Sequence, residues 1–187
     1  VFSSIDLQGR YAYLNQPIIA KWNLARFAES LLPLIDGDKN KSIENAKKAV
    51  DSFDKIYKEN WLEMMNKKLG LLGIKNDDEN LINDLLLIME ENKLDYTNTF
   101  CLLMDENLQK NNLLKNKNFT DWYKKWKNRV ERDGDSFKES LKIMRSSNPL
   151  VIPRNHKVEE VLDEASKNNL VPLHDFLKIL EKPYENQ

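Results

Sequence analysis

Cysteine, glycine and proline are scarce in this sequence: its 187 residues include one cysteine, five glycines and six prolines. One cysteine cannot form a disulfide within the chain, which excludes a disulfide-rich secreted scaffold and favours a cytoplasmic protein. The scarcity of glycine and proline, together with abundant Lys, Glu, Asn and Leu, favours helices over sheets. Long apolar runs are lacking too, because none approaches the roughly 18 residues that a membrane-spanning helix needs. We therefore expect no membrane partner.

A net charge of one sign is also absent, since 29 Lys and Arg are balanced by 30 Asp and Glu, which gives −1. Nucleic-acid binding usually needs a positive surface that displaces counterions, so we expect no nucleic-acid partner. The segment Trp122–Arg129 does interleave aromatic and basic residues. In a helix, however, Trp122 and Trp126 would share the face that packs into the core, and the lysines between them would face water. The abundance of Asn, Lys and Ile is typical of an AT-rich, bacterial genome.

Apolar residues recur at helical spacing through most of the chain from Trp22 onward, and no segment sustains the two-residue alternation of a strand. This pattern predicts a single all-α domain over residues 22–187, preceded by an ordered loop over residues 1–21. The predicted helices cover about residues 22–32, 42–69, 79–89, 96–103, 121–132, 137–144, 156–165 and 172–180.

Several helix ends carry recognisable signals. Thr120 and Asn155 are expected to cap the helices that follow them, because their side chains can accept a hydrogen bond from a first-turn N–H. Ser136 begins the capping-box pattern Ser-Phe-Lys-Glu. Pro33 and Asp36-Gly-Asp38 are expected to close the first helix, and Pro172 to stand at the first position of the last one.

The sequence Asp36-Gly-Asp38-Lys-Asn40 resembles the start of a calcium-binding loop. In such a loop the sixth position is Gly and the twelfth is a bidentate Glu, but here they are Lys41 and Lys47. Without that Glu, calcium would lose its strongest ligand and face an ammonium group. We therefore interpret this stretch as a solvated turn between two helices.

Other catalytic and metal-binding patterns are weak. His156 and His174 are the only histidines, lie on different predicted helices, and have no Cys or carboxylate at ligand spacing, so we expect no metal site. Cys101 stands in an apolar run, which favours an inert buried thiol over a nucleophile. No glycine-rich phosphate loop and no Ser-centred nucleophile elbow is present.

The N-terminal stretch Asp6–Pro17 is the best functional candidate, because it combines a cation, side-chain amides and aromatic rings within a turn-forming segment. The guanidinium of Arg10 suits a phosphate or carboxylate. The alternative is a structural loop that docks on the first helix. The chain also opens at Val1 without a Met, so we expect it to be the later part of a longer protein. The candidate residues are Gln8, Arg10, Tyr11, Asn15 and Gln16.

These same residues carry a family resemblance. The stretch Ser4–Pro17, followed by Trp22–Pro33, resembles the selenoprotein O family, also called YdiU. The later stretches occur in the family's order, so the resemblance extends over the whole chain. These later stretches are Lys67–Leu71, Met144–Pro149 with Pro153–Asn155, and Leu180–Gln187.

The resemblance implies a protein-kinase-like fold that moves AMP from ATP, with Mg²⁺ or Mn²⁺, onto Ser, Thr or Tyr hydroxyls of proteins. The family's catalytic, ATP-binding and metal-binding residues all precede the segment that matches Ser4–Pro17. The resemblance therefore implies no catalytic, cofactor or metal residue in this chain, which alone would be inactive. Residues 1–21 would be the end of the activation segment and residues 22–187 the helical C-terminal lobe. The implied partners are the protein's own N-terminal lobe and its protein substrates. The alternative is a non-catalytic helical interaction module.

Overall fold

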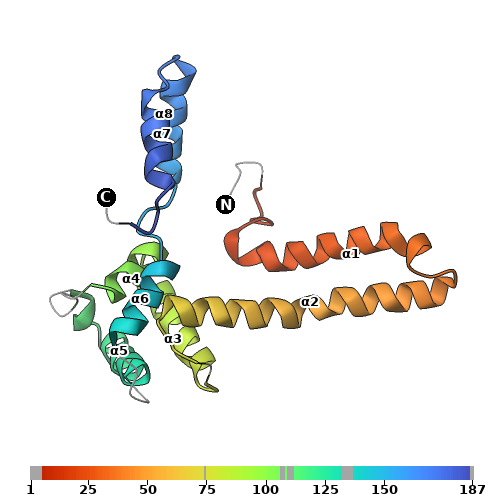
Figure 1. Cartoon of the computed structure of the whole chain (residues 1–187), viewed down its shortest axis with the longest axis horizontal. Helices are drawn as coiled ribbons and strands as arrows, with labels where there is room; N and C mark the ends of the chain where they lie inside the picture. The colour runs from red at the N-terminus through yellow and green to blue at the C-terminus, as the bar shows by residue number, and fades with distance from the viewer. Residues whose placement is uncertain (1–5, 74, 106–107, 109–111, 132–136, 186–187) are drawn as a thin grey trace. The chain divides into compact units, whose positions relative to one another are not determined.

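The computed structural model describes residues 6–73, 75–105, 108, 112–131 and 137–185 (Figure 1). All regular elements among these residues are helical, which confirms the predicted all-α class for them. The elements are η1 (Tyr13–Asn15), α1 (Gln16–Ile35), α2 (Lys39–Lys68), α3 (Asp78–Glu91), α4 (Tyr96–Leu103), η3 (Asn112–Lys115), α5 (Lys117–Val130), α6 (Phe137–Ser147), α7 (Asn155–Ser166) and α8 (Val171–Leu180).

The chain forms two compact units, Val1–Trp61 and Leu62–Gln187. This division rests on compactness alone. The predicted boundary between residues 21 and 22 separates a loop from a helical lobe, so the two compact units do not test it. It stays a prediction. One detail of it is wrong, because Gln16–Lys21 belong to α1 and not to a loop. The helix can start there because Pro17 occupies its first turn, where the missing N–H costs nothing.

The first unit holds α1 and the beginning of α2, joined by a tight turn. The Asp36 carboxylate accepts a hydrogen bond from the Asp38 N–H at 2.8 Å. The Asp38 carboxylate accepts from the N–H groups of Asn40 at 2.7 Å and Lys41 at 3.1 Å, and so caps α2. Both carboxylates therefore serve the turn, which agrees with its interpretation as a helix–helix connection.

Helix α1 ends at Ile35, directly before Asp36, so the predicted closure at Asp36-Gly-Asp38 is confirmed, but Pro33 lies inside the helix and does not itself end it. A proline removes one backbone hydrogen bond, and here the helix continues for only two more residues, to Ile35. Nearby, the Ser42 hydroxyl of α2 donates to the Leu32 carbonyl of α1. This bond ties the two helices together close to their turn.

The core of the second unit surrounds α5, which packs against α3 and η3. The indole N–H of Trp122 donates to the Leu81 carbonyl at 2.8 Å, and that of Trp126 to the Leu69 carbonyl at 2.9 Å. The prediction that both tryptophans face the core is confirmed. Other fully buried side chains come from every helix between α2 and α6: Met65, Ile82, Leu85, Phe100, Leu103, Phe119, Val130 and Met144.

The helix α5 begins earlier than predicted, at Lys117. Its cap is Asn116, whose side chain accepts from the Phe119 N–H at 3.1 Å. The Thr120 hydroxyl instead donates to the Leu114 and Asn116 carbonyls at 2.6 and 3.0 Å, so the prediction of a Thr120 cap is wrong. Two possible caps four residues apart compete, and the earlier one wins because it adds another turn of helix.

The start of α7 also differs from the prediction, since Asn155 is its first helical residue and Arg154 occupies the N-cap position. No side chain caps that end. The predicted capping residue Ser136 lies outside the described residues, which resume at Phe137 with α6. Pro172 lies in the first turn of α8, close to the predicted position. α7 and α8 pack against each other as a helical hairpin (Figure 1).

The C-terminal end of α2 is closed by a residue far along the chain. The side-chain amide of Asn148 donates to the Lys68 carbonyl at 2.8 Å and to the Met144 carbonyl at 2.9 Å. Gly70 follows with φ +66°, and a Cβ there would lie 2.9 Å from the Ser140 carbonyl oxygen. Only glycine fits this position, because both the backbone conformation and the close approach of α6 exclude a side chain.

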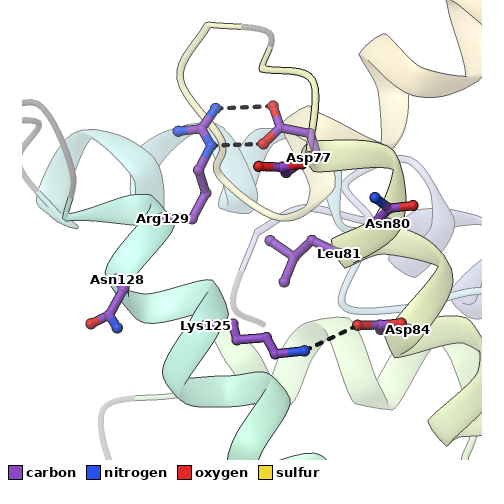
Figure 2. Close-up of a pocket in the computed structure, with 8 residues that line it drawn as sticks. Asp77, Asn80, Leu81, Asp84, Lys125, Asn128 and Arg129 are labelled. Atoms are coloured by element: carbon purple, nitrogen blue, oxygen red, sulfur yellow. Dashed lines mark hydrogen bonds and ion pairs between the residues drawn. The ribbon is translucent and has the colours of Figure 1, made fainter.

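A buried ion pair connects α5 with the first residue of α3 (Figure 2). The Arg129 guanidinium donates to the two Asp78 carboxylate oxygens at 2.7 and 3.0 Å, and to the Leu72 and Gly73 carbonyls at 3.1 Å each. Asp78 also accepts from the Lys75 N–H at 2.8 Å. The side chains of Arg129 and Asp78 are only 9% and 3% exposed. The pair therefore fixes the course of the chain between α2 and α3.

We expect Asp78→Asn to lower the free energy of unfolding by about 3 kcal/mol, because it leaves a guanidinium buried without its counter-charge. Urea denaturation followed by circular dichroism measures this loss. The matched control is Asp84→Asn, which breaks an exposed pair with Lys125 at 3.5 Å and should cost less than about 0.5 kcal/mol. Equal losses for the two variants would contradict the structural role of the buried pair.

Candidate functional site

The N-terminal loop before α1 is held by its own hydrogen bonds. The Asp6 carboxylate accepts from the N–H groups of Arg10 and Tyr11, both at 2.8 Å. The Gly9 N–H donates to the Asp6 carbonyl at 3.1 Å, and Gly9 has φ +65°, in the left-handed region that favours glycine. Asp6 therefore organises the loop, and the side chains on it are presented in a defined way.

The polar candidates in this loop fall into two groups. The Asn15 amide donates to the Gly9 carbonyl at 2.8 Å, so it closes the loop and does not cap α1. Gln16 is the first residue of α1. The Gln8 and Gln16 side chains are exposed and make no side-chain hydrogen bond to another described residue. Asn15 is thus part of the scaffold, and Gln8 and Gln16 remain available to a ligand.

Arg10 lies over aromatic rings. Its guanidinium carbon is 4.8 Å from the ring centre of Trp22 on α1 and 5.6 Å from that of Tyr11. Arg26 contacts the same indole at 5.6 Å, but its guanidinium is already paired with Glu29 at 2.5 Å. The Arg10 guanidinium forms no ion pair with a described residue, so its N–H groups can bind a carboxylate or phosphate while the indole holds it in place.

The structure therefore brings together Arg10 and Tyr11 of the predicted set and adds Trp22 and Arg26 to them. Trp22 was expected in the first helix and in the family-like stretch Trp22–Pro33, but not as a site residue. The four-residue spacing between Trp22 and Arg26 was the available signal, because residues four apart on a helix are neighbours. The contact with Arg10 depends on the loop fold and has no such signal.

A shallow groove of about 470 Å³ lies between α1 and α2, next to Trp22. Its walls are mostly apolar, and one side is closed by a hydrogen bond from the Lys21 amine to the Asp54 carboxylate at 2.5 Å. A groove of this kind suits an apolar side chain of a protein segment more than a nucleotide. The lining residues are Pro17, Ile18, Lys21, Trp22, Ala25, Val50, Phe53, Asp54 and Tyr57.

A second hollow, between α3 and α5, is lined by acidic and basic side chains (Figure 2). Asp78 is bound to Arg129, and Asp84 is paired with Lys125. These carboxylates are neutralised by cations, so they do not form a metal site. We interpret this hollow as a surface feature beside the buried ion pair.

No group of three or more His, Cys, Asp or Glu side chains converges among the described residues to hold a metal ion. None of the helices in the described part of the chain has the length and apolar character required to cross a membrane.

Cys101 and Lys68 lie close together at the junction of α2 and α4. The Cys101 thiol donates to the Pro149 carbonyl at 3.5 Å, and burial raises its pKa, so it stays protonated at neutral pH. The Lys68 amine lies 4.6 Å from the ring centre of Phe100, and burial lowers its pKa. The thiol is half-buried rather than fully buried, and its raised pKa supports the prediction that it is inert.

Comparison with known proteins identifies the family. The family model described as "Protein adenylyltransferase SelO" matches residues 1–181. The chain belongs to the SelO family. Proteins named "Protein nucleotidyltransferase YdiU" are 51% identical over 185 residues in Clostridium botulinum (strain Loch Maree / Type A3) and 48% identical over 184 residues in Pelagibacter ubique (strain HTCC1062). Each alignment covers 98% of this chain and 38% of the relative.

The relative from Alcanivorax borkumensis is 46% identical over 188 residues, which cover the whole of this chain and 39% of that protein. This SelO-family chain thus spans about two fifths of the length of the curated relatives it matches.

Arg154 lies in one of the stretches that resemble the family, and it binds Asp95 at the start of α4. Its two terminal nitrogens donate to the two Asp95 oxygens at 2.7 and 3.0 Å. Asp95 also caps α4 by accepting from the Asn98 N–H at 2.8 Å. The hydrogen bond from Arg154, followed by that from Asn98, lowers the pKa of Asp95 to about 2. This pair joins the segment before α7 to α4.

The Asp95–Arg154 pair predicts a specific pH dependence of stability. Because the folded pKa lies below the ordinary value, the pair contributes fully above about pH 4 and its contribution is lost as the pH falls towards 2. We expect the difference in free energy of unfolding between the wild type and Arg154→Gln to shrink over that range. Urea denaturation at steps from about pH 6 to pH 2 measures it.

The Asp95→Asn background provides the control for this experiment, since Arg154→Gln should then have almost no pH-dependent effect. Both side chains are more than a third exposed, so solvent screening keeps the effect modest. A difference that stays constant down to about pH 2 would contradict the pairing.

Proposed function

We propose that this chain is the C-terminal helical part of a protein adenylyltransferase, which transfers AMP from ATP to Ser, Thr or Tyr hydroxyls of proteins. The observation that carries the proposal is the SelO family match over residues 1–181, with relatives named as protein nucleotidyltransferases. These relatives are more than twice as long as this chain. We propose that the longer protein has a kinase-like fold whose helical C-terminal lobe includes this chain.

Transfer of a nucleotidyl group needs a divalent metal ion and a cradle for the phosphates. The described residues do not fit either group, because their acidic side chains do not converge and no glycine-rich loop opens a helix. We propose that ATP and Mg²⁺ or Mn²⁺ bind elsewhere in the longer protein. The isolated chain is then inactive and does not bind ATP–Mg²⁺.

We propose that the N-terminal loop contributes to the protein-substrate side of the reaction. The Arg10 guanidinium has N–H donors that no described side chain occupies, and Trp22 restricts its movement. Tyr11 contacts the Arg10 guanidinium, and the side chains of Gln8 and Gln16 are exposed in the same loop and at the start of α1. Such a set suits a carboxylate on a protein substrate, which would orient the acceptor hydroxyl towards the nucleotide.

The test of the proposed function is transfer of label from α-labelled ATP to protein, with the isolated chain beside the full-length protein that carries it. We expect label only with the full-length protein, in the presence of Mg²⁺ or Mn²⁺. Label with the isolated chain would show that catalytic groups lie within it. No label with either protein would remove the case for adenylyl transfer and favour the non-catalytic interaction module.

Arg10→Ala in the full-length protein should raise the KM for a protein substrate by about tenfold and leave the KM for ATP unchanged, because one charge-assisted contact is lost. Arg10→Lys should restore only part of the affinity, since an ammonium lacks the planar fork. The control is Lys48→Ala, which removes an exposed cation that is paired with Glu44 on α2, outside the loop, and should leave both KM values unchanged. Initial rates at varied substrate and ATP measure all three, and an unchanged KM in Arg10→Ala would contradict the role.

A further inference from the structure

One side of helix α1, which is apolar apart from Lys21, faces α2. Side chains three and four residues apart share a face of a helix, and Ile18, Lys21, Ala25 and Leu32 follow this spacing. The bond from Lys21 to Asp54 and the shared groove place this side of α1 against α2. These residues account for one side of the helix only.

A second apolar stripe follows the opposite side of α1, with steps of four, three, four and three residues. This seam consists of Ala20, Leu24, Phe27, Leu31 and Leu34. Three of the five seam side chains are exposed, since 42% of Leu24, 61% of Phe27 and 81% of Leu34 are accessible, and Ala20 and Leu31 are half-buried. The structure classes no residue of α1 as buried.

The alternation of three- and four-residue steps is the pattern by which helices pack side by side. The seam runs for about 21 Å along α1, at about 1.5 Å per residue, which is close to four helical turns. A helix that is apolar on two opposite sides belongs in the interior of a larger fold. The first unit supplies a partner for one side only.

We propose that the seam is an internal packing surface, covered by an amphipathic helix from the part of the SelO-family protein that lies outside this chain. The inference rests on the proposed function in one respect, namely that the chain is one part of a longer protein. More than half of the length of the relatives lies outside the aligned segment, which is ample sequence to supply such a helix. The apolar seam and its length define what that helix must present, namely a matching stripe of about four turns.

Hydrogen exchange of the amides in α1 tests the proposal on the full-length protein and on this chain alone. We expect the amides of residues 20–34 to exchange at least about tenfold more slowly in the full-length protein, because the covered helix opens less often. Equal exchange in the two proteins would overturn the proposal. This readout does not depend on transfer activity, so it can succeed where the proposed function fails.

The double variant Phe27→Glu and Leu34→Glu places charges on the seam. In the full-length protein we expect it to abolish the slow exchange of residues 20–34 and to lower the melting temperature. The matched control is Glu29→Lys, which reverses an exposed charge on the side of the same helix that carries Arg26, away from the seam. If the double variant and the control keep the same protection, the seam is not a packing surface.

A second copy of the chain is the competing occupant, and light scattering distinguishes it. Under the proposal the full-length protein keeps slow exchange in α1 at concentrations where it is monomeric. Slow exchange that disappears on dilution, together with dissociation of a dimer, would assign the seam to contact between copies and overturn the proposal. The isolated chain should self-associate weakly through the same exposed seam, and the double variant should suppress this.

Discussion

Burial of one guanidinium–carboxylate pair governs the core of residues 62–187. A buried charge is costly unless a counter-charge and hydrogen bonds offset it. Nε and one terminal nitrogen of Arg129 bind Asp78 and two backbone carbonyls, while the other terminal nitrogen has no partner among the described residues. The same face of α5 presents Trp122 and Trp126, whose indole N–H groups bind the carbonyls of Leu81 and Leu69. Helix α5 is therefore located by directional bonds as well as by apolar packing. These bonds determine how α3 and the end of α2 approach it.

Apolar periodicity predicted the all-α class and the core-facing tryptophans, because both depend on spacing within one helix. The helix ends were less predictable: Thr120 and Asn116 both suit a cap, and local sequence does not decide between them. Arg129 lies on the predicted core side of its helix, but its partner is 51 residues away. Pairing across such a distance depends on the tertiary fold, so the sequence alone could not supply it.

The candidate site was also only partly predictable from the sequence. The turn-forming residues predicted an ordered loop, and the chemistry of Arg10 marked it as a ligand-binding group. The contact between Arg10 and Trp22 arises only when the loop folds back onto α1, with Gly9 in a left-handed conformation. Family membership gives this geometry its context, because the chain spans about two fifths of the length of its relatives. Under the proposed function, the catalytic groups belong to the rest of the longer protein and the loop contacts its protein substrate.

The cap that Asn148 places on the end of α2 has a consequence for folding during synthesis. The side-chain donor for the Lys68 carbonyl is Asn148, which is synthesised 80 residues later. Until that donor has left the ribosome, the end of α2 is solvated by water and the site for α6 beside Gly70 stays empty. The second unit therefore cannot close the end of α2 until α6 and the residue that follows it have been synthesised.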